Sequence, residues 1–402
     1  MIYTFPRIPL NTSQPGSIKQ CFSKFKLDGD VLDKVDAIEH HKKNYYTFFN
    51  QLVMDKNFIP TLEEIKKEQA YLHSTIDLLE VGVKTSYNIS QSYTPFLHKS
   101  HKLSLGSDNV SSLFAEYILA RYAYALGSVR FLQKKMNHHM TNVIKDSNFD
   151  EGTSKEIIEV FKLGFVRLAK LYKNKGLIWQ QLNKEYNEKP ELRLSTLDII
   201  YKVNEINLAN LYIFDNILGK DLKEMPSKVR MFLLCICKVT LNKINSLMLI
   251  AKNFKEYTEI EQLQDFLVAY RYFYQFVIFS LLIRENKYCE DMSNVGERMD
   301  RSLSQIYYEN HLIIAKLLKE EKELDAYSKK SKDHVFIPLI ADLYKKILRN
   351  KELIKWGYQT YEDMKNEIAR HLSKTPTLDD IFARISSDDI IENKVNKLIQ
   401  DE

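Results

Sequence analysis

The sequence contains few of the residues that make tight turns or disulfide frameworks. Its 402 residues include only eleven glycines, nine prolines and four cysteines, whereas an average chain has about 7% glycine and about 5% proline. This scarcity favours long helices joined by few tight turns. The cysteines form no CxxC pair, and Cys235 and Cys237 lie in the apolar run MFLLCIC, so buried thiols in a reducing compartment are expected.

The chain also lacks a block of one charge and a long uninterrupted apolar run. Its 58 basic and 53 acidic side chains are interspersed and give a net charge of only +5. This distribution argues against a nucleic-acid partner, which requires a concentrated basic stripe, and leaves a weak attraction to anionic membranes open. In residues 266–283 Arg271 and Gln275 interrupt the apolar run, which indicates a central buried helix rather than a membrane span.

The N-terminal MIYTFPRIPL has no basic segment followed by an apolar stretch. A signal peptide needs both, so none is expected and the protein is predicted to be cytoplasmic.

Aromatic and long aliphatic residues are abundant instead. There are 24 tyrosines and 21 phenylalanines, and aromatic-rich helical proteins use such rings to fill the gaps between crossing helices. In LFAEYILARYAYALG (113–127) large and small residues alternate around the whole predicted helix, and only Glu116 and Arg121 are charged. A helix of this kind has neighbours on several sides.

Helical signals run from about residue 25 almost to the C-terminus. Before them, YTFPRIPL indicates a short extended or β element within residues 1–25. Capping boxes predict helix starts at Thr61, Thr153 and Thr377. Breaks are predicted near Pro60, Gly106, Gly152, Gly176, Pro190, Pro226, Pro338 and Pro376.

The sequence shows no low-complexity linker and no fixed-period repeat. It therefore predicts one mainly α domain over residues 1–402, closed by helices at about 339–402. Long helices with apolar residues on all sides favour an elongated layered bundle or an irregular solenoid of helix pairs.

Sequence signatures of catalysis are missing. There is no glycine-rich phosphate loop, HExxH or GxSxG motif. Asp388, Asp389 and Glu392 have the spacing of a magnesium-binding face, but no second acidic cluster opposes them, so a solvated helix start is expected. The other candidate metal ligands are adjacent or isolated: Glu39, His40, His41, His138, His139, Glu367 and His371. We predict no enzyme, no metal and no cofactor.

The segment SKEIIEVFKLGFVRLAKL (154–171) has an apolar stripe wider than one neighbouring helix covers. Its core-facing positions are Ile157, Phe161, Leu168 and Leu171, with Ile158 and Phe165 at the edge. Gly164 lies mid-helix, where glycine costs about 1 kcal/mol relative to alanine, and so indicates the close approach of another helix. The stripe edge is a candidate docking surface, and complete intramolecular burial is the competing interpretation.

Several segments together resemble the BRO-domain family, the boomerang-shaped, Alix-like helical modules of ESCRT-associated proteins. Residues 113–127 are similar to its LFN-aliphatic helix, and Gly164-Phe165 is similar to the small-aromatic pair of the next long helix. VNEINLANLY (203–212) is similar to its AQAQE helix. ENKYCEDMSNV (285–295) is similar to a turn that opens a later helix, and DHVFIP (333–338) is similar to its F-I-Y motif. The residues that depart from the family pattern are Leu208, Asn210, Cys289 and Pro338. The short layout is most similar to the PalC type, the alkaline-pH response regulators of fungi.

This resemblance implies a curved, non-enzymatic scaffold. Members of the family hold the C-terminal amphipathic helix of the ESCRT-III filament subunit on their concave face. PalC-type members support the recruitment of a calpain-like protease complex that cleaves a zinc-finger transcription factor, at endosomal or cortical membrane sites. Carried over position by position, the resemblance implies a partner-binding patch of Ile158, Phe165, Leu211, Tyr212 and Leu222, in which Ile157 and Tyr212 are the alternatives to Ile158 and Leu211 if the register shifts by one.

Two other hypotheses are compatible with the sequence. A helical structural subunit of a larger endosomal-trafficking complex has no peptide groove and predicts large obligate interfaces. A helical enzyme of the prenyl-transfer type needs two facing acidic clusters, of which the sequence offers only Asp388, Asp389 and Glu392.

Overall fold

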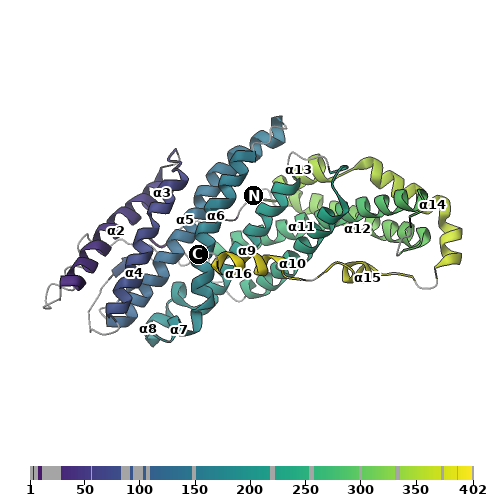
Figure 1. The fold of residues 1–402 in the computed structure, drawn as a ribbon. Helices are drawn as coiled ribbons and strands as arrows, with labels where there is room; N and C mark the ends of the chain where they lie inside the picture. Colours follow the sequence, from purple (N-terminus) through teal and green to yellow (C-terminus); the bar gives the residue numbers. More distant parts are fainter. Residues whose placement is uncertain are drawn as a thin grey trace.

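Long helices lie side by side along an elongated molecule. The structure is a computed structural model of the 402-residue chain. It describes residues 3, 8–10, 29–55, 57–82, 91–93, 103–105, 109–146, 151–217, 222–252, 258–297, 301–330, 336–372, 375–386 and 388–400. Figure 1 shows the elongated, helical architecture, which confirms the predicted mainly α fold.

The elements follow one another in the order shown in Figure 1. The first part of the chain forms α2 (Gly29–Met54), α3 (Leu62–Lys67), α4 (Gln69–Gly82), β1 (Gln91–Tyr93), β2 (Leu103–Leu105), α5 (Asn109–Asp146), α6 (Glu151–Lys173), α7 (Lys175–Trp179), α8 (Lys184–Glu188), a 3-10 turn η1 (Pro190–Leu192) and α9 (Leu194–Ile217). The second part forms α10 (Ser227–Lys252), α11 (Thr258–Asn294), α12 (Leu303–Lys330), α13 (Phe336–Leu343), a π-helical turn η2 (Tyr344–Leu348), α14 (Lys351–His371), α15 (Leu378–Ala383) and α16 (Ile390–Gln400).

The two strands lie outside the region for which an extended element was predicted. β1 and β2 pair antiparallel, with Ser92 opposite Ser104. Most of residues 1–25 lie outside the described residues, but Tyr3 is buried against α9. Its backbone N–H donates to Asn207 Oδ1 at 2.9 Å, and Asn207 Nδ2 donates to the Tyr3 carbonyl at 3.0 Å.

Helix α5 is an inner helix, as predicted for residues 113–127. It packs against α2 and α4 on one side and α6 on the other (Figure 1). Both charged residues of this stretch are buried: Glu116 accepts hydrogen bonds from the Tyr46 and Tyr71 hydroxyls, and Arg121 Nη1 donates to Thr75 Oγ1 at 3.4 Å. Burial lowers the pKa of Arg121 to about 10, so the guanidinium keeps its charge at neutral pH.

The predicted close approach at Gly164 is confirmed. A Cβ added there would lie 2.8 Å from both Ser128 Cβ and Ser128 Oγ, and 3.3 Å from Ala125 Cα. Both neighbours belong to α5, so the absence of a side chain at this position sets how closely α5 and α6 pack.

The apolar run at 266–283 forms the centre of α11. By length and composition α10 and α11 could each span a bilayer, but 83% of the apolar window of α11 is buried inside the protein. Tyr274 in its middle donates a hydrogen bond to Asn210 Oδ1 of α9 at 2.6 Å. The predicted central buried helix is therefore confirmed.

Some predicted boundaries are confirmed and others are wrong. Thr61 and Thr377 form the predicted capping boxes with the acidic residues three positions later. The start predicted at Thr153 is wrong, because α6 already begins at Glu151. Pro338 does not itself end a helix. It lies in the first turn of α13, just after the helix start at Phe336, where a proline costs no intrahelical hydrogen bond.

The turn expected at 285–295 is also wrong. These residues continue α11 as far as Asn294, and the turn follows at Val295 and Gly296, where Gly296 has φ 86°. That left-handed conformation favours glycine.

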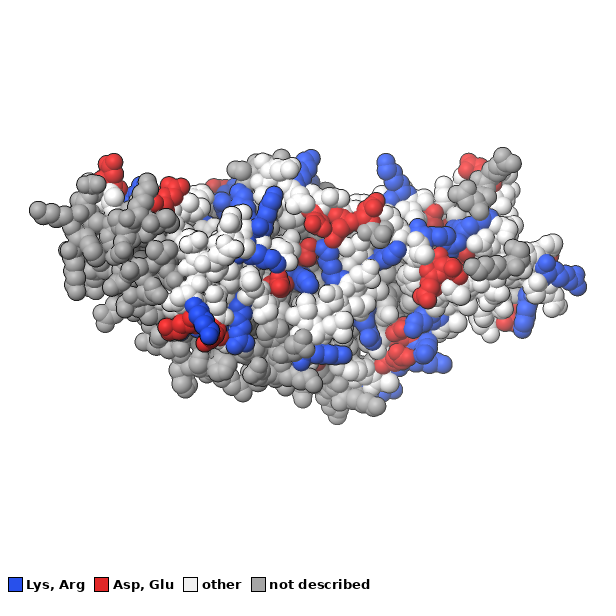
Figure 2. All heavy atoms as spheres, turned by 90° about the horizontal axis from the view of Figure 1, so that it is seen from below, with Lys and Arg blue, Asp and Glu red and all other residues white. Residues whose placement is uncertain are grey.

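On one face of the molecule the charges are mixed. In Figure 2 the basic and acidic side chains of the described residues are interspersed and gather into no stripe of one sign. This face therefore has no feature that favours a nucleic-acid partner.

We expect Gly164→Ala to destabilise the protein. The new methyl group must push α6 away from Ser128 and Ala125, at a cost of about 1 to 3 kcal/mol in the free energy of unfolding. Urea unfolding followed by circular dichroism measures the change. Gly176→Ala is the control, because a Cβ at Gly176 meets nothing within 4 Å; equal losses in both variants would contradict the close packing.

A second prediction concerns Glu68, which lies half-buried between α3 and α4. Loss of hydration raises the pKa of its carboxyl from 4.5 to about 7. The folded chain therefore binds this proton more tightly than the unfolded chain does, and the free energy of unfolding falls as the pH rises through that interval. Glu68→Gln should remove this fall and raise stability at pH 8 by about 1 kcal/mol, after allowance for solvent screening.

Urea unfolding at pH 5 and pH 8 measures this difference. Glu63→Gln is the matched control, since the Glu63 side chain is 73% exposed on the same short helix. A pH dependence that is unchanged by Glu68→Gln would show that another group is responsible.

Candidate helix-binding surface

The predicted partner patch falls where α6, α9 and α10 come together in the middle of the molecule. Figure 1 shows the C-terminal helix α16, in yellow, in the same region, and α16 packs against all three helices. Half-buried apolar side chains mark this place: Ile158 on α6, Tyr212 on α9 and Phe232 on α10. We call it the α6–α9–α10 surface.

Only two of the five predicted patch residues reach this surface. Ile158 and Tyr212 are half-buried, whereas Phe165, Leu211 and Leu222 are only 1%, 4% and 5% exposed. The expectation that these three are accessible is therefore corrected: all three belong to the hydrophobic core. Leu222 lies in the turn between α9 and α10 rather than on a helix.

On α6 the alternative register, which puts Ile157 in the patch in place of Ile158, is less suited to binding. Ile157 is 2% exposed and belongs to the core-facing stripe, together with Phe161, Leu168 and Leu171. Of the two neighbours, Ile158 is the one whose side chain is partly accessible.

Phe165 is buried because aromatic rings join α6 to α9. Its ring stacks on Tyr201 of α9 with centroids 5.6 Å apart, and Tyr201 stacks on Tyr172 of α6 at 4.0 Å. Stacked rings bury large apolar areas and fix the relative position of the two helices. The periodicity of α6 alone placed Phe165 at the stripe edge and contained no signal for this contact.

Helix α16 covers the accessible part of the patch. Lys394 Nζ lies 3.8 Å from the centre of the Tyr212 ring and 5.1 Å from that of Phe232. The next residue, Val395, is 2% exposed. Sequence reasoning placed closing helices at 339–402 but missed that the last of them packs against this surface.

An ion-pair cluster holds the N-terminal end of α16. Lys243 Nζ of α10 lies 2.6 Å from Glu205 Oε1 and 2.9 Å from Asp389 Oδ2. Burial raises the pKa of Glu205. Although burial alone lowers the pKa of Lys243, its two carboxylate neighbours raise it overall.

The acidic cluster near the C-terminus is a helix start, as predicted. Asp389 Oδ1 accepts a hydrogen bond from the Glu392 backbone N–H at 2.9 Å and so caps α16. Among the residues that the structure describes, no three His, Cys, Asp or Glu side chains come together as a metal site.

The other metal candidates lie on helix surfaces or outside the described side chains. His41 Nδ1 is 2.7 Å from Ser74 Oγ, and Glu367 and His371 are exposed on α14. The side chains of His138 and His139 lie outside the described part of α5.

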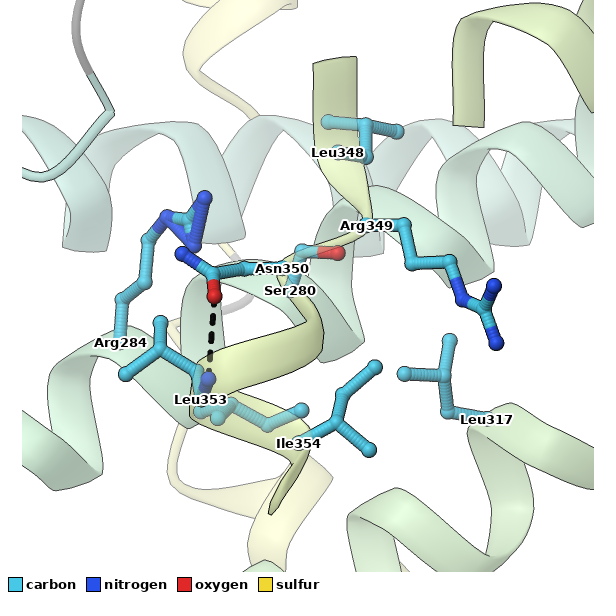
Figure 3. Close-up of a pocket in the computed structure, with 9 residues that line it drawn as sticks. Ser280, Arg284, Leu317, Leu348, Arg349, Asn350, Leu353 and Ile354 are labelled. Carbon is cyan, nitrogen blue, oxygen red and sulfur yellow. Dashed lines mark hydrogen bonds between the residues drawn. The ribbon is translucent and has the colours of Figure 1, made fainter. Parts of the chain in front are cut away.

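A pocket beside α14 is the alternative candidate site. Figure 3 shows Leu317, Leu353 and Ile354 around it, with Arg284 and Arg349 at its margins. Asn350 there caps α14, because its Oδ1 accepts from the Leu353 N–H at 3.0 Å. The lining includes Ser280 but, among the described residues, no His, Cys, Asp or Glu that could serve as a general base to activate its hydroxyl.

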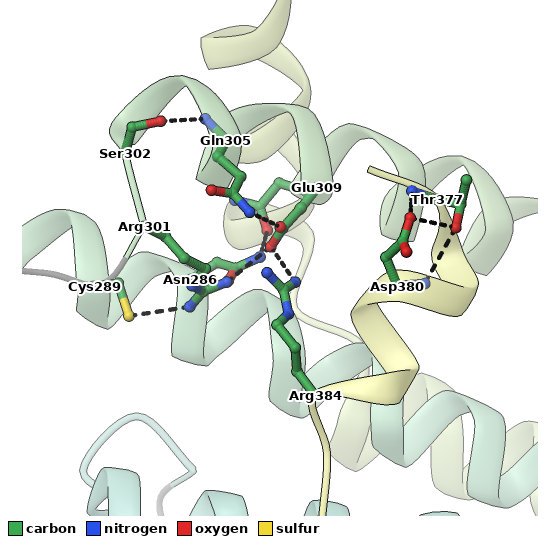
Figure 4. Close-up of polar contacts among 10 residues, drawn as sticks. Asn286, Cys289, Arg301, Ser302, Gln305, Glu309, Thr377, Asp380 and Arg384 are labelled. Atoms are coloured by element: carbon green, nitrogen blue, oxygen red, sulfur yellow. Dashed lines mark hydrogen bonds and ion pairs between the residues drawn. The ribbon is translucent and has the colours of Figure 1, made fainter. Parts of the chain in front are cut away.

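A second cluster anchors the segment that leads to α16. Figure 4 shows two guanidinium groups directed at the fully buried Glu309 of α12: Arg301 at 2.8 Å and Arg384, just after α15, at 2.7 Å. Arg301 also donates to Asn286 Oδ1 of α11 at 2.7 Å. The cluster thus ties α15 to the core independently of α16.

Comparison with known proteins bears on the fold. No family model and no curated protein matches the sequence. Among solved structures, the chain is similar to one described as "Structure basis for endosomal targeting by the Bro1 domain", with a TM-score of 0.55, 11% identity and 99% of each chain covered. The chain has the fold of a Bro1 domain.

The Bro1 fold confirms the family resemblance at the level of architecture. This fold agrees with the predicted elongated arrangement of helix pairs. The α6–α9–α10 surface is the place in this Bro1 fold where an added helix is already seated.

Removal of the Lys243 ammonium should lower the stability of the protein, because this group pairs with Glu205 and with Asp389 at the start of α16. Lys243→Met leaves the Glu205 carboxylate buried without its cation, which should lower the free energy of unfolding by about 2 kcal/mol. Urea unfolding measures the loss, and Lys252→Met, an exposed lysine at the end of the same helix, is the control. A loss no larger than that of the control would mean that the cluster contributes nothing to stability.

Proposed function

We propose that this protein is a non-enzymatic scaffold that binds the C-terminal amphipathic helix of the ESCRT-III filament subunit on the α6–α9–α10 surface. The observation that carries the proposal is that this surface of a Bro1 fold is shaped to hold a short helix, since it holds α16. The solved Bro1 domain to which the chain is similar is described as acting in endosomal targeting.

The chemistry of the surface suits an amphipathic ligand. Ile158 lies one turn from Lys162 on α6, and α6 packs against α9, which carries Tyr212. Half-buried apolar side chains surrounded by charged ones can anchor the apolar face of a helix and satisfy its polar edges.

We further propose a role in alkaline-pH signalling of the PalC type. The support is the Bro1 fold together with the family-like segments in the sequence. In this role the protein reaches endosomal or cortical membrane sites through ESCRT-III and supports a calpain-like protease complex that activates a zinc-finger transcription factor. The protein itself acts from the cytoplasm as an adaptor.

One observation favours the structural-subunit alternative. Phe165, Leu211 and Leu222 are buried by the chain itself and offer no apolar groove of their own. In that case the α6–α9–α10 surface belongs to intramolecular packing, and the protein acts through other faces.

Calorimetric titration of the full chain with the ESCRT-III helix peptide tests the proposal. Binding is expected with a dissociation constant between about 1 and 100 μM. Ile158→Asp places a charge in the apolar contact and should weaken binding at least about tenfold. Leu177→Asp is the matched control, because Leu177 is 71% exposed on α7, away from the surface.

The outcomes separate the hypotheses. Equal binding by wild type and Ile158→Asp would place the peptide elsewhere on the protein. No binding even at millimolar peptide, by a chain shown to be folded, would favour the structural subunit.

A further inference from the structure

The contacts that hold α16 on the α6–α9–α10 surface are both apolar and polar. Among its described side chains Val395 is the only one fully buried, and Ile399 packs, half-buried, against the core. The described polar contacts are the Lys394 ammonium over the Tyr212 ring and the pair of Asp389 with Lys243. A helix of eleven residues is marginally stable by itself, so α16 depends on its contacts with α6, α9 and α10.

Like charges also oppose one another at this seat. Burial lowers the pKa of Lys394, and the positive charge of Lys162 on α6 lowers it further. At the other end Asp389 and Glu392 bring further negative charge towards the buried Glu205, where Lys243 is the cation that compensates them. Repulsion between these like charges, most of which are partly exposed to solvent, opposes the attachment of α16.

The chain before α16 is held separately and firmly. Ile381 and Ile385 are each 2% exposed. Arg384 pairs with the buried Glu309, and Lys238 Nζ donates to the Ile385 carbonyl at 2.6 Å. Because α15 ends at Ala383 and α16 begins only at Ile390, α16 can leave its seat while α15 stays in place.

We propose that α16 is an intramolecular ligand of the α6–α9–α10 surface, and that a partner helix binds there by displacing it. This inference rests on the proposed function of the same surface and adds its regulation. The chain is then partly self-inhibited, and the apparent affinity for a partner is reduced by the fraction of molecules in which α16 is seated.

The contacts of α16 also define the ligand that this surface accepts. An acidic residue at its N-terminal end meets Lys243, as Asp389 does. Five positions later a basic residue lies over Tyr212 and Phe232, as Lys394 does, and a branched aliphatic residue follows directly, as Val395 does. The favoured partner is a short amphipathic helix with this order of acidic, basic and aliphatic residues.

The test uses the full-length chain with α16 unseated. Val395→Asp puts a carboxylate into the buried position, and Asn396→Asp makes the same change in charge at the exposed neighbouring position. A fluorescent peptide of residues 388–402 should bind Val395→Asp roughly tenfold or more tightly than wild type or Asn396→Asp, because its site is then empty. Fluorescence anisotropy measures the affinities.

A second variant guards against a folding defect in Val395→Asp. Asp389→Asn removes the charge that pairs with Lys243 while asparagine still caps the helix. It should raise the affinity for the 388–402 peptide in the same direction, by about threefold. Circular dichroism should show that every variant keeps the helical content of the wild type.

The ESCRT-III helix peptide, titrated into the same variants, separates the two proposals. Tighter binding to Val395→Asp and competition with the 388–402 peptide would support both. Equal binding of this peptide to all variants would overturn the inference and leave the proposed function standing. If Val395→Asp binds the 388–402 peptide but not the ESCRT-III peptide, α16 remains a detachable ligand and the ESCRT-III partner is rejected. If the 388–402 peptide binds all variants equally weakly, the inference is overturned directly.

Discussion

The close contact between α5 and α6 determines how the rest of the surface is built. At Gly164 the backbone of α6 approaches Ala125 and Ser128 of α5 to distances that leave no room for a side chain. This approach turns the apolar stripe of α6 into the core and leaves Ile158 at its margin. The position of every element that packs on α6, including α9 and α16, follows from this contact.

Aromatic rings and buried polar groups fix the positions of α9 and α11 relative to α6. The stacked series of Phe165, Tyr201 and Tyr172 fixes α9, and Tyr274 ties α9 to the central α11 through Asn210. Buried polar contacts of this kind add geometric specificity to an apolar core, because each has few alternative partners.

Two separate sets of contacts hold the C-terminal segment, one at α15 and one at α16. The fully buried Glu309 forms ion pairs with Arg301 and Arg384, and the pair with Arg384 holds α15 against α12. Among the described residues, α16 is held instead by the buried Val395 and by the pair of Asp389 with Lys243. A difference in local stability between neighbouring segments allows one of them to move without unfolding the domain.

The sequence by itself determined the features that depend on neighbours along the chain. Periodicity identified the inner helix at 113–127 and the buried helix at 266–283, mid-helix glycine identified the contact at Gly164, and hydroxyl-acid spacing identified the caps at Thr61 and Thr377. Only the tertiary structure decided that Phe165 and Leu211 are buried, that α11 continues to Asn294, and that α16 covers Tyr212. Such features depend on residues far apart in sequence, as Lys394 and Tyr212 are, and local periodicity contains no information about which distant helix will meet a given face.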